Sequence, residues 1–423
     1  MREGQRIRAE DWPALLAPGM RVFLHGSTSE PLALRAILEA AASRATGVDF
    51  TIGIVPGVNE YDYAALAPAA SMTTGFVTPS LRASFAAGRI RFLPLNYTGF
   101  HDYLAAAPPF DLAVLQVAPP DADGRMSLGV STDFPSAILP RVRRVLVQLN
   151  EAMPRIADGP FLAAADLLVE STHALPEFPE AAPDATQTAI ANNAASLIRD
   201  GDCLQIGIGK IQSAILGQLK GHRRLGFHSG LMTDAVLDLM EAGAMSGEAK
   251  SRDRGLAVTG LAVGTRRLYE ALARLPVAFR EARYTHGTDI LAGIDNFVSI
   301  NSAIEIDLFG QCNAEMLGGR QVSGTGGFAD FVRGARLSRS GRSIVALPAT
   351  AAGGRHSRIR ARLDAGTAVT GARSDTDLVV TEYGIASLKG LSLDQRAASL
   401  IAIAAPEFRA GLQAEWDKFR ASL

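Results

Sequence analysis

The sequence predicts an α/β protein built from two similar open α/β domains with mostly parallel sheets. Short runs of β-branched and leucine residues alternate with alanine-rich helical patterns throughout the 423 residues, and this alternation is typical of parallel sheets. The chain is also too long for one ordinary hydrophobic core. A proline-rich segment from His173 to Thr186 interrupts the alternation, because prolines at that density oppose both helix and central strand. We therefore expect an N-terminal domain over residues 1–171, a linker over 172–194 and a C-terminal domain over 195–423.

The first domain begins with a strand predicted over Arg21–His25, which ends in the turn at Gly26. A helix is predicted over Leu32–Ala42, since Pro31 stands near its first position, where proline is tolerated. Three further strands are predicted by the same apolar pattern, over Asp49–Ile54, Leu112–Val117 and Val145–Leu149.

The second domain repeats this order of elements. Its helix is predicted over Gln212–Leu219, and its strands over Cys203–Ile208, Leu225–His228, Leu256–Val263, Val298–Ile300, Ser343–Leu347 and Asp377–Thr381. Two open α/β halves with a crevice between them are a natural binding place for a long, cofactor-like ligand.

Composition favours a small-molecule ligand over a macromolecular one. The chain has 42 Lys and Arg against 43 Asp and Glu, and no charge run suggests a nucleic-acid or membrane partner. Cys203 and Cys312 are too far apart in sequence to indicate a disulfide framework or a metal site. No apolar run approaches the ~20 residues that a membrane span requires, and the first residues lack the apolar segment of a signal peptide. We expect a cytoplasmic protein without a metal.

A glycine turn, Gly207-Ile208-Gly209-Lys210, follows one predicted strand and precedes a helix. Glycines there let backbone N–H groups approach a ligand oxygen, and a helix N-terminus favours negative charge. This arrangement suits a thioester carbonyl that becomes an oxyanion. A plain tight turn explains the same residues without any ligand.

Two later segments are richer in polar and glycine residues. In the segment Asn301–Asn313, Glu305 and Asp307 alternate with apolar residues, as in a strand with one polar face. The loop Gly324-Thr325-Gly326-Gly327 exposes backbone that amides or a phosphate can contact. An ordinary amphipathic strand and a flexible loop are the alternatives.

Together these segments resemble the acetyl-CoA hydrolase/transferase family of class I coenzyme A transferases, which includes 4-hydroxybutyrate CoA-transferases. The resemblance spans roughly Arg21 to Arg409 and rests on the segments Pro119–Gly129, Val147–Arg155, Gln205–Lys210, Gly226–Asp234, Asn301–Asn313, Gly324–Phe331 and Thr376–Ala386. It implies a CoA-transferase-like fold, acyl-CoA and small carboxylates as substrates, and no permanently bound cofactor. It also implies a homodimer or higher homo-oligomer.

The resemblance assigns binding roles within the C-terminal half. It implies that coenzyme A or the thioester contacts Gly207, Ile208, Gly209, Lys210, Asn301, Gly324, Gly326 and Gly327. In the family a glutamate directly follows the His-Ser pair and attacks the thioester to form a covalent intermediate. Here His228 and Ser229 are followed by Gly230, which has no group that can take part.

Three explanations of Gly230 stay open from the sequence. Another side chain replaces the nucleophile, from among Ser229, Asp234, Glu241, Glu281 and Glu305. Alternatively, water attacks the thioester, with Glu305 or His228 as the candidate base. In the third, the chain is a CoA-thioester binding or regulatory protein without turnover. We favour an acyl-CoA enzyme that moves CoA between small carboxylic acids or hydrolyses the thioester.

Overall fold

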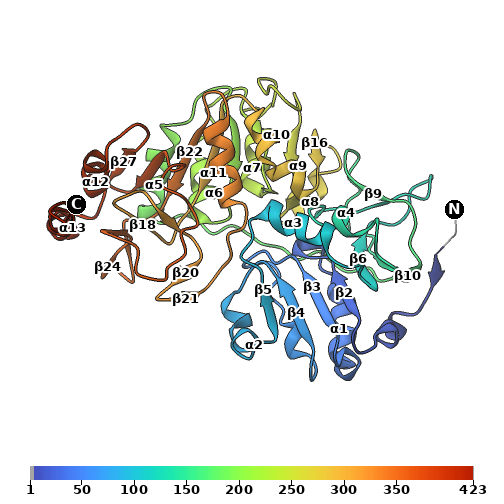
Figure 1. Cartoon of the computed structure of the whole chain (residues 1–423). Coiled ribbons are helices and arrows are strands. Elements are labelled where there is room, and N and C mark those ends of the chain that lie inside the picture. Colours follow the sequence, from blue (N-terminus) through green and yellow to red (C-terminus); the bar gives the residue numbers. More distant parts are fainter. Residues whose placement is uncertain (1–3, 423) are drawn as a thin grey trace. The chain divides into compact units, whose positions relative to one another are not determined.

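The computed structural model describes residues 4–422, and its contacts divide them into two compact units (Figure 1). Unit 1 holds the described residues up to Pro179 together with Met232–Asp234 and Val258–Thr285. Unit 2 holds Glu180–Leu231, Ala235–Ala257 and the described residues from His286 onward. The units are therefore not continuous in sequence, and the predicted domain limits at residues 171 and 194 stay a prediction. Residues 1–3 and 423, the extreme ends of the predicted domains, lie outside the described residues.

Unit 1 is built on an eight-stranded sheet in which every neighbouring pair of strands is parallel. The order across the sheet is β1 (Gln5–Arg6), β10 (Leu167–Glu170), β8 (Val145–Leu149), β6 (Leu112–Val117), β2 (Arg21–Leu24), β3 (Asp49–Ile52), β4 (Ser71–Thr74) and β5 (Ile90–Phe92). The predicted strands over 21–25, 49–54, 112–117 and 145–149 all lie in this sheet.

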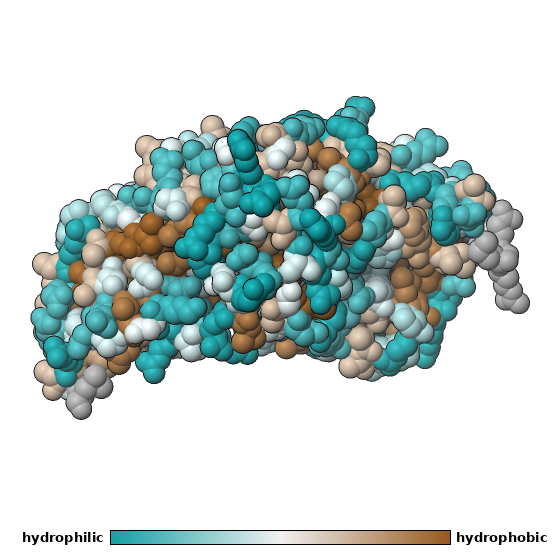
Figure 2. Space-filling view, turned by 90° about the horizontal axis from the view of Figure 1, so that it is seen from above, coloured by the Kyte–Doolittle hydropathy of each residue, from teal (hydrophilic) through white to brown (hydrophobic). Residues whose placement is uncertain are grey.

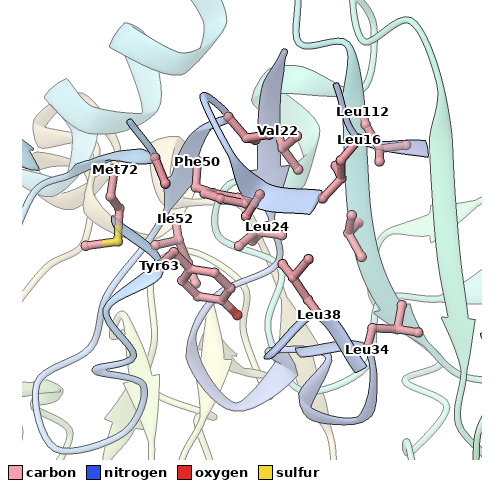
Figure 3. Packing of buried hydrophobic residues seen from close by; sticks show 14 of the residues in the cluster. Leu16, Val22, Leu24, Leu34, Leu38, Phe50, Ile52, Tyr63, Met72 and Leu112 are labelled. Carbon is pink, nitrogen blue, oxygen red and sulfur yellow. The ribbon is translucent and has the colours of Figure 1, made fainter. Parts of the chain in front are cut away.

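Strand β6 explains why apolar runs in this chain form central strands. All six of its residues are buried, and successive side chains point to opposite faces of a strand. Leu112 and Val114 join the core cluster that contains α1 (Leu32–Ala40), and Ala113 joins the one that contains α3 (Tyr97–Ala106). The α1 cluster is drawn in Figure 3. Helices therefore cover both faces of the sheet, as a strand that is buried on both faces requires.

The remaining elements of unit 1 are short. They are α2 (Arg82–Ala86), α4 (Pro135–Ile138), α8 (Arg266–Ala271), β7 (Met126–Ser127), β9 (Phe161–Leu162), β15 (Leu261–Ala262) and β16 (Val277–Phe279).

Unit 2 has a six-stranded sheet that is parallel except at one edge. Its order is β12 (Gly226–Phe227), β11 (Cys203–Ile206), β17 (Phe297–Asn301), β22 (Arg342–Ala346), β26 (Leu378–Thr381) and β27 (Gly384–Ser387). Only the β26–β27 pair is antiparallel. The two mostly parallel sheets confirm the predicted fold class.

Four helices of this unit pack in pairs. Helix α5 (Ala185–Ala195) packs against α6 (Lys210–Gly217), and α10 (Thr288–Ala292) packs against α11 (Phe328–Leu337). Helix α5 begins inside the proline-rich segment, because Asp184 and Gln187 form a reciprocal capping box after the last proline. The other elements of the C-terminal half are α12 (Leu393–Ala402), α13 (Pro406–Arg420), β18 (Glu305–Asp307), β19 (Cys312–Asn313), β20 (Met316–Leu317), β21 (Arg320–Gln321), β23 (Thr350–Ala351), β24 (His356–Ser357) and β25 (Ile359–Arg360).

Four described elements include residues of both units: β13 (Leu231–Met232), α7 (Asp234–Glu241), β14 (Ala257–Thr259) and α9 (Ala282–His286). The predicted strand over Leu256–Val263 is broken into β14 (Ala257–Thr259) and β15, and neither belongs to the six-stranded sheet. Gly260 separates the two strands, and glycine within a strand pattern weakens it.

The surface in Figure 2 is mainly hydrophilic on the displayed face, with smaller apolar areas between the polar residues. Among residues 4–422, no helix combines the length and the apolar character needed to cross a membrane.

Candidate functional site

The glycine turn connects β11 to α6 within unit 2. The N–H of Gly207 donates to the Ile300 carbonyl at 2.9 Å and so continues the ladder between β11 and β17. Gly209 is the N-cap of α6 and has φ of 138°, a conformation that other L-residues rarely adopt. The first N–H groups of a helix have no partner within the helix. The groups best suited to an oxyanion are therefore those of the first turn of α6, from Lys210 onward, rather than that of Gly207.

Asn301 and Gln205 form a buried clamp between neighbouring strands. Each side-chain amide donates to the other, at 3.2 Å from Gln205 Nε2 to Asn301 Oδ1 and at 3.0 Å in the reverse direction. A Cβ atom on Gly207 would lie 3.2 Å from Asn301 Oδ1. Asn301 thus holds the strand ends together directly beneath the glycine turn, and its contact with coenzyme A stays a prediction.

Gln212 and Ser302, which the sequence analysis did not select as site residues, support the same turn. Gln212 Nε2 donates to Ser302 Oγ at 2.7 Å, and Ser302 Oγ donates to the Ala346 carbonyl at 2.9 Å. This chain of hydrogen bonds links the first turn of α6 to the ends of β17 and β22. The start of α6 is therefore held by two side chains and a backbone carbonyl that come from three sequence-distant segments.

Gly230 is buried, and its space is already occupied. Its φ is not among the positive values found at other glycines, so the backbone itself permits a side chain. A Cβ atom there would lie 2.5 Å from His286 Cε1 and 2.7 Å from His286 Nε2. The imidazole of His286 therefore fills the volume that any side chain at position 230 needs.

His286, at the end of α9, also contacts the glycine-rich loop. A Cβ atom on Gly327 would lie 2.6 Å from His286 Cδ2 and 2.7 Å from Nε2. The ring packs against Phe331 of α11 with centroids 4.4 Å apart, and His286 is only 3% exposed. Two predicted site glycines, far apart in sequence, thus meet at one imidazole that the sequence analysis missed. No local pattern marks His286, because its position depends on tertiary packing alone.

The rest of the glycine-rich loop leads into α11. Gly327 is the N-cap of this helix, and Gly326 has φ of 54°, in the left-handed region. Gly324 is buried and Gly326 is partly exposed. The glycines at 326 and 327 are therefore needed for different reasons, the first for its backbone angle and the second for the approach of His286.

Most of the proposed substitute nucleophiles are engaged in structural contacts. Ser229 Oγ donates to the Ile206 carbonyl at 3.1 Å, and Glu281 Oε2 lies 3.8 Å from His101 Nε2. Asp234 accepts hydrogen bonds of 2.7 Å from both the N–H and the hydroxyl of Thr265. Glu241 ends helix α7. Ser229 and Asp234 are thus engaged in structural hydrogen bonds, and a nucleophilic role for any of these four residues stays a prediction.

The two candidate bases predicted from the sequence, His228 and Glu305, lie in different local environments. His228 Nδ1 is 3.9 Å from Asp253 Oδ2, and the His228 side chain is fully buried. Glu305 is in the small sheet β19-β18-β25, where its carboxylate accepts from Asn313 Nδ2 at 2.9 Å and lies 3.8 Å from Arg360 Nε. A catalytic role for either residue stays a prediction.

Metal chemistry has no obvious ligand set in the part of the chain that is described. Within residues 4–422, no group of three or more His, Cys, Asp or Glu side chains is placed to hold a metal ion. Cys203 and Cys312 are both buried, and burial raises the pKa of each thiol to about 12, so neither suits a reactive thiolate.

Comparison with family models and curated proteins gives a consistent result. The acetyl-CoA hydrolase/transferase N-terminal domain matches residues 5–180, and the C-terminal domain of the same family matches residues 264–416. The 4-hydroxybutyrate coenzyme A transferase of Clostridium kluyveri is 36% identical over 401 residues, which cover 94% of this chain and 93% of that protein. The butyryl-CoA:acetate CoA-transferase of Anaerostipes caccae is 38% identical and covers 77% of this chain and 74% of its own length.

Solved structures agree with these matches. RipA from Yersinia pestis has a TM-score of 0.90 and 32% identity, covering 98% of both chains. The 4-hydroxybutyrate CoA-transferase of Porphyromonas gingivalis has a TM-score of 0.81 and 29% identity, covering 99% of this chain and 98% of its own. The protein is therefore an acyl-CoA enzyme that belongs to the acetyl-CoA hydrolase/transferase family.

Proposed function

We propose that this enzyme cleaves acyl-CoA thioesters without a covalent glutamyl-CoA intermediate. The observation that carries the proposal is the imidazole of His286 in the space of a side chain at position 230. The proposal takes Gly230 as the position of the family's nucleophile, as the sequence resemblance implies. Without that carboxylate no acyl-glutamyl anhydride can form, so water or an acceptor carboxylate must attack the thioester directly.

Binding is assigned to unit 2. The first turn of α6, beginning at Lys210, faces the thioester oxygen with backbone N–H groups, and Gly209 allows the turn that exposes them. The thiol end of coenzyme A lies near Gly207 and Gly230, and the pantetheine arm follows Gly324–Gly327. The contact of His286 with both Gly230 and Gly327 supports this placement, because it brings the two predicted segments to one point.

The wider functional setting is part of the same proposal. Coenzyme A enters as a substrate with its acyl group, and no other cofactor is bound permanently. The relatives named as CoA-transferases and those named as acetyl-CoA hydrolases support a small carboxylic acid as the acyl group. We further propose a cytoplasmic homodimer or higher homo-oligomer.

A panel of acyl-CoAs, incubated with and without acetate, tests this function. We expect release of free coenzyme A thiol without acetate, and little acetyl-CoA when acetate is added. Intact-mass spectrometry after borohydride treatment should show no reduced glutamyl adduct on the protein. An adduct on the unchanged chain would contradict the proposal, and peptide mapping would then identify the carboxylate responsible. Binding of acyl-CoA with no turnover of any member of the panel would favour a regulatory binding protein instead.

A further inference from the structure

We propose that His286 is the catalytic base of this enzyme and activates water for hydrolysis of the acyl-CoA thioester. The inference rests on the proposed function, since it assigns a residue and an acceptor to that same site. It differs from the sequence-based candidates, Glu305 and His228, in both residue and position.

The geometry places one ring nitrogen at the centre of the predicted site. Nε2 of His286 would be 2.7 Å from a Cβ atom at Gly230 and also 2.7 Å from one at Gly327. Only two residues without side chains allow the nitrogen so close to both backbone segments. The nitrogen therefore lies between the position of the missing nucleophile and the start of the loop assigned to the pantetheine arm.

The ring is held in a fixed orientation by its neighbours. Phe331 packs on it at 4.4 Å, and Phe331 is itself buried with Phe297, Leu291 and Cys203 in one apolar cluster. His286 ends α9, and Gly287 is the N-cap of α10, so helices begin and end on either side of it. A base held rigidly at the reacting centre is what general-base catalysis requires.

The ring of His286 lies against Gly230, Gly327 and Phe331. Histidine is the side chain whose ordinary pKa lies closest to neutral pH, so it can accept and release protons near pH 7.

The reaction balances with water as the only co-reactant. His286 takes a proton from water as the oxygen bonds to the thioester carbonyl carbon, and the carbonyl electrons move to oxygen. The first turn of α6 stabilises this oxyanion. The carbon–sulfur bond then breaks, the thiolate takes the proton from the imidazolium, and a carboxylic acid and coenzyme A leave.

The test compares His286→Gln, which keeps a side chain of similar reach without a basic nitrogen, with His286→Ala, which empties the space. Both should lower kcat for thiol release by about 100-fold or more, the usual contribution of a general base. The affinity for coenzyme A, measured by calorimetry, should change by less than about threefold in His286→Gln. His356→Gln is the matched control, because His356 is exposed in β24 outside the site, and it should leave kcat unchanged.

Two further readouts separate a base from a packing residue. The wild-type rate should fall at low pH as an imidazole protonates, and this limb should disappear in His286→Gln. Added imidazole should restore activity to His286→Ala, whereas thiazole, similar in shape and far less basic, should not.

The outcomes distinguish the two proposals. If the wild type hydrolyses acyl-CoA and His286→Gln retains its rate, the role of His286 is wrong and the proposed function stands. Equal rescue by imidazole and thiazole would likewise overturn the role as a base, since it would show that only volume matters. If the wild type neither binds coenzyme A nor releases thiol from any acyl-CoA, the proposed function fails, and the role of His286 fails with it.

Discussion

At the scale of single residues, Gly230 and His286 depend on one another. Because the imidazole is within 2.7 Å of any Cβ atom at 230, Gly230→Glu forces the buried ring to move. Overpacking of this kind costs about 1–3 kcal/mol, so we expect the single variant to have a lower free energy of unfolding in urea. We also expect it to gain no CoA transfer to acetate, because the carboxylate and the ring compete for one space.

The double variant Gly230→Glu with His286→Ala is the matched control. Removal of the ring makes room for the carboxylate, and the backbone of Gly230 is outside the left-handed region, so the angle itself is no obstacle. We expect the double variant to regain stability and to show a borohydride-reducible glutamyl adduct with acyl-CoA. A stable, fully folded single variant would contradict the predicted clash.

Asp133 in unit 1 gives a prediction about pH. Burial raises the pKa of its carboxyl to about 7, although the hydrogen bond from Tyr97 and the nearby His101 oppose the shift. Because the folded-state pKa is above the unfolded value, the folded state holds the proton more tightly, and stability falls as pH rises from about 4 to about 7. Asp133→Asn keeps an acceptor for Tyr97 and removes the titration.

We therefore expect Asp133→Asn to be more stable than the wild type at pH 8, by an amount on the order of 4 kcal/mol from the shift in pKa. The advantage should shrink steadily as the pH is lowered to 4. Urea unfolding of both proteins at several pH values measures this difference. A difference that does not change with pH would show that Asp133 is ionised in the folded protein at every pH tested.

At the scale of elements, the glycine turn of the predicted site lies where a parallel strand ends and a helix begins. Strands β11 and β17 are joined by the clamp of Gln205 and Asn301, and the turn above them leads into α6. Helix α11 also begins after a glycine, its N-cap Gly327, but the strand before it, β21, belongs to an antiparallel pair. Ligands of open α/β sheets bind beyond the carboxyl ends of the strands, and the glycine turn lies at such an end.

Gly326 provides the prediction at this scale. Its φ of 54° disfavours a β-branched residue, whereas asparagine adopts such an angle readily. We expect Gly326→Val to lower stability by roughly 1–2 kcal/mol and to weaken coenzyme A binding in calorimetry. Gly326→Asn should keep the loop conformation, and its stability should be close to that of the wild type. If Val and Asn weaken binding equally while both remain stable, the ligand needs an empty space at 326 rather than a backbone angle.

At the scale of the whole molecule, coenzyme A binding should raise the free energy of unfolding. A ligand present at a hundredfold excess over its Kd stabilises the native state by about 2.7 kcal/mol. We expect a rise in Tm that grows with the logarithm of the coenzyme A concentration. Acetate alone at the same concentrations is the control and should give no comparable rise. The same Tm with and without coenzyme A would contradict binding.

The sequence by itself determined the fold class and most strands of the two sheets. Mainly apolar runs such as Leu112–Val117 form central strands because both of their faces are covered. The sequence also placed the glycine turn before a helix, and this turn begins α6 in the structure. Local patterns therefore sufficed wherever a residue's surroundings come from its own segment.

The prediction of a strand over Leu256–Val263 was less accurate, because short apolar runs do not show whether they join the main sheet. Only part of the candidate site could be predicted from the sequence, for a related reason. Gly230 was recognised from a motif, but nothing near residue 286 indicated that its ring would fill the empty space. Which side chain enters a buried gap is decided by close packing between segments distant in sequence. The resemblance predicted that the family's glutamate is absent at position 230, and only the tertiary structure decided that the imidazole of His286 fills the space of a side chain there.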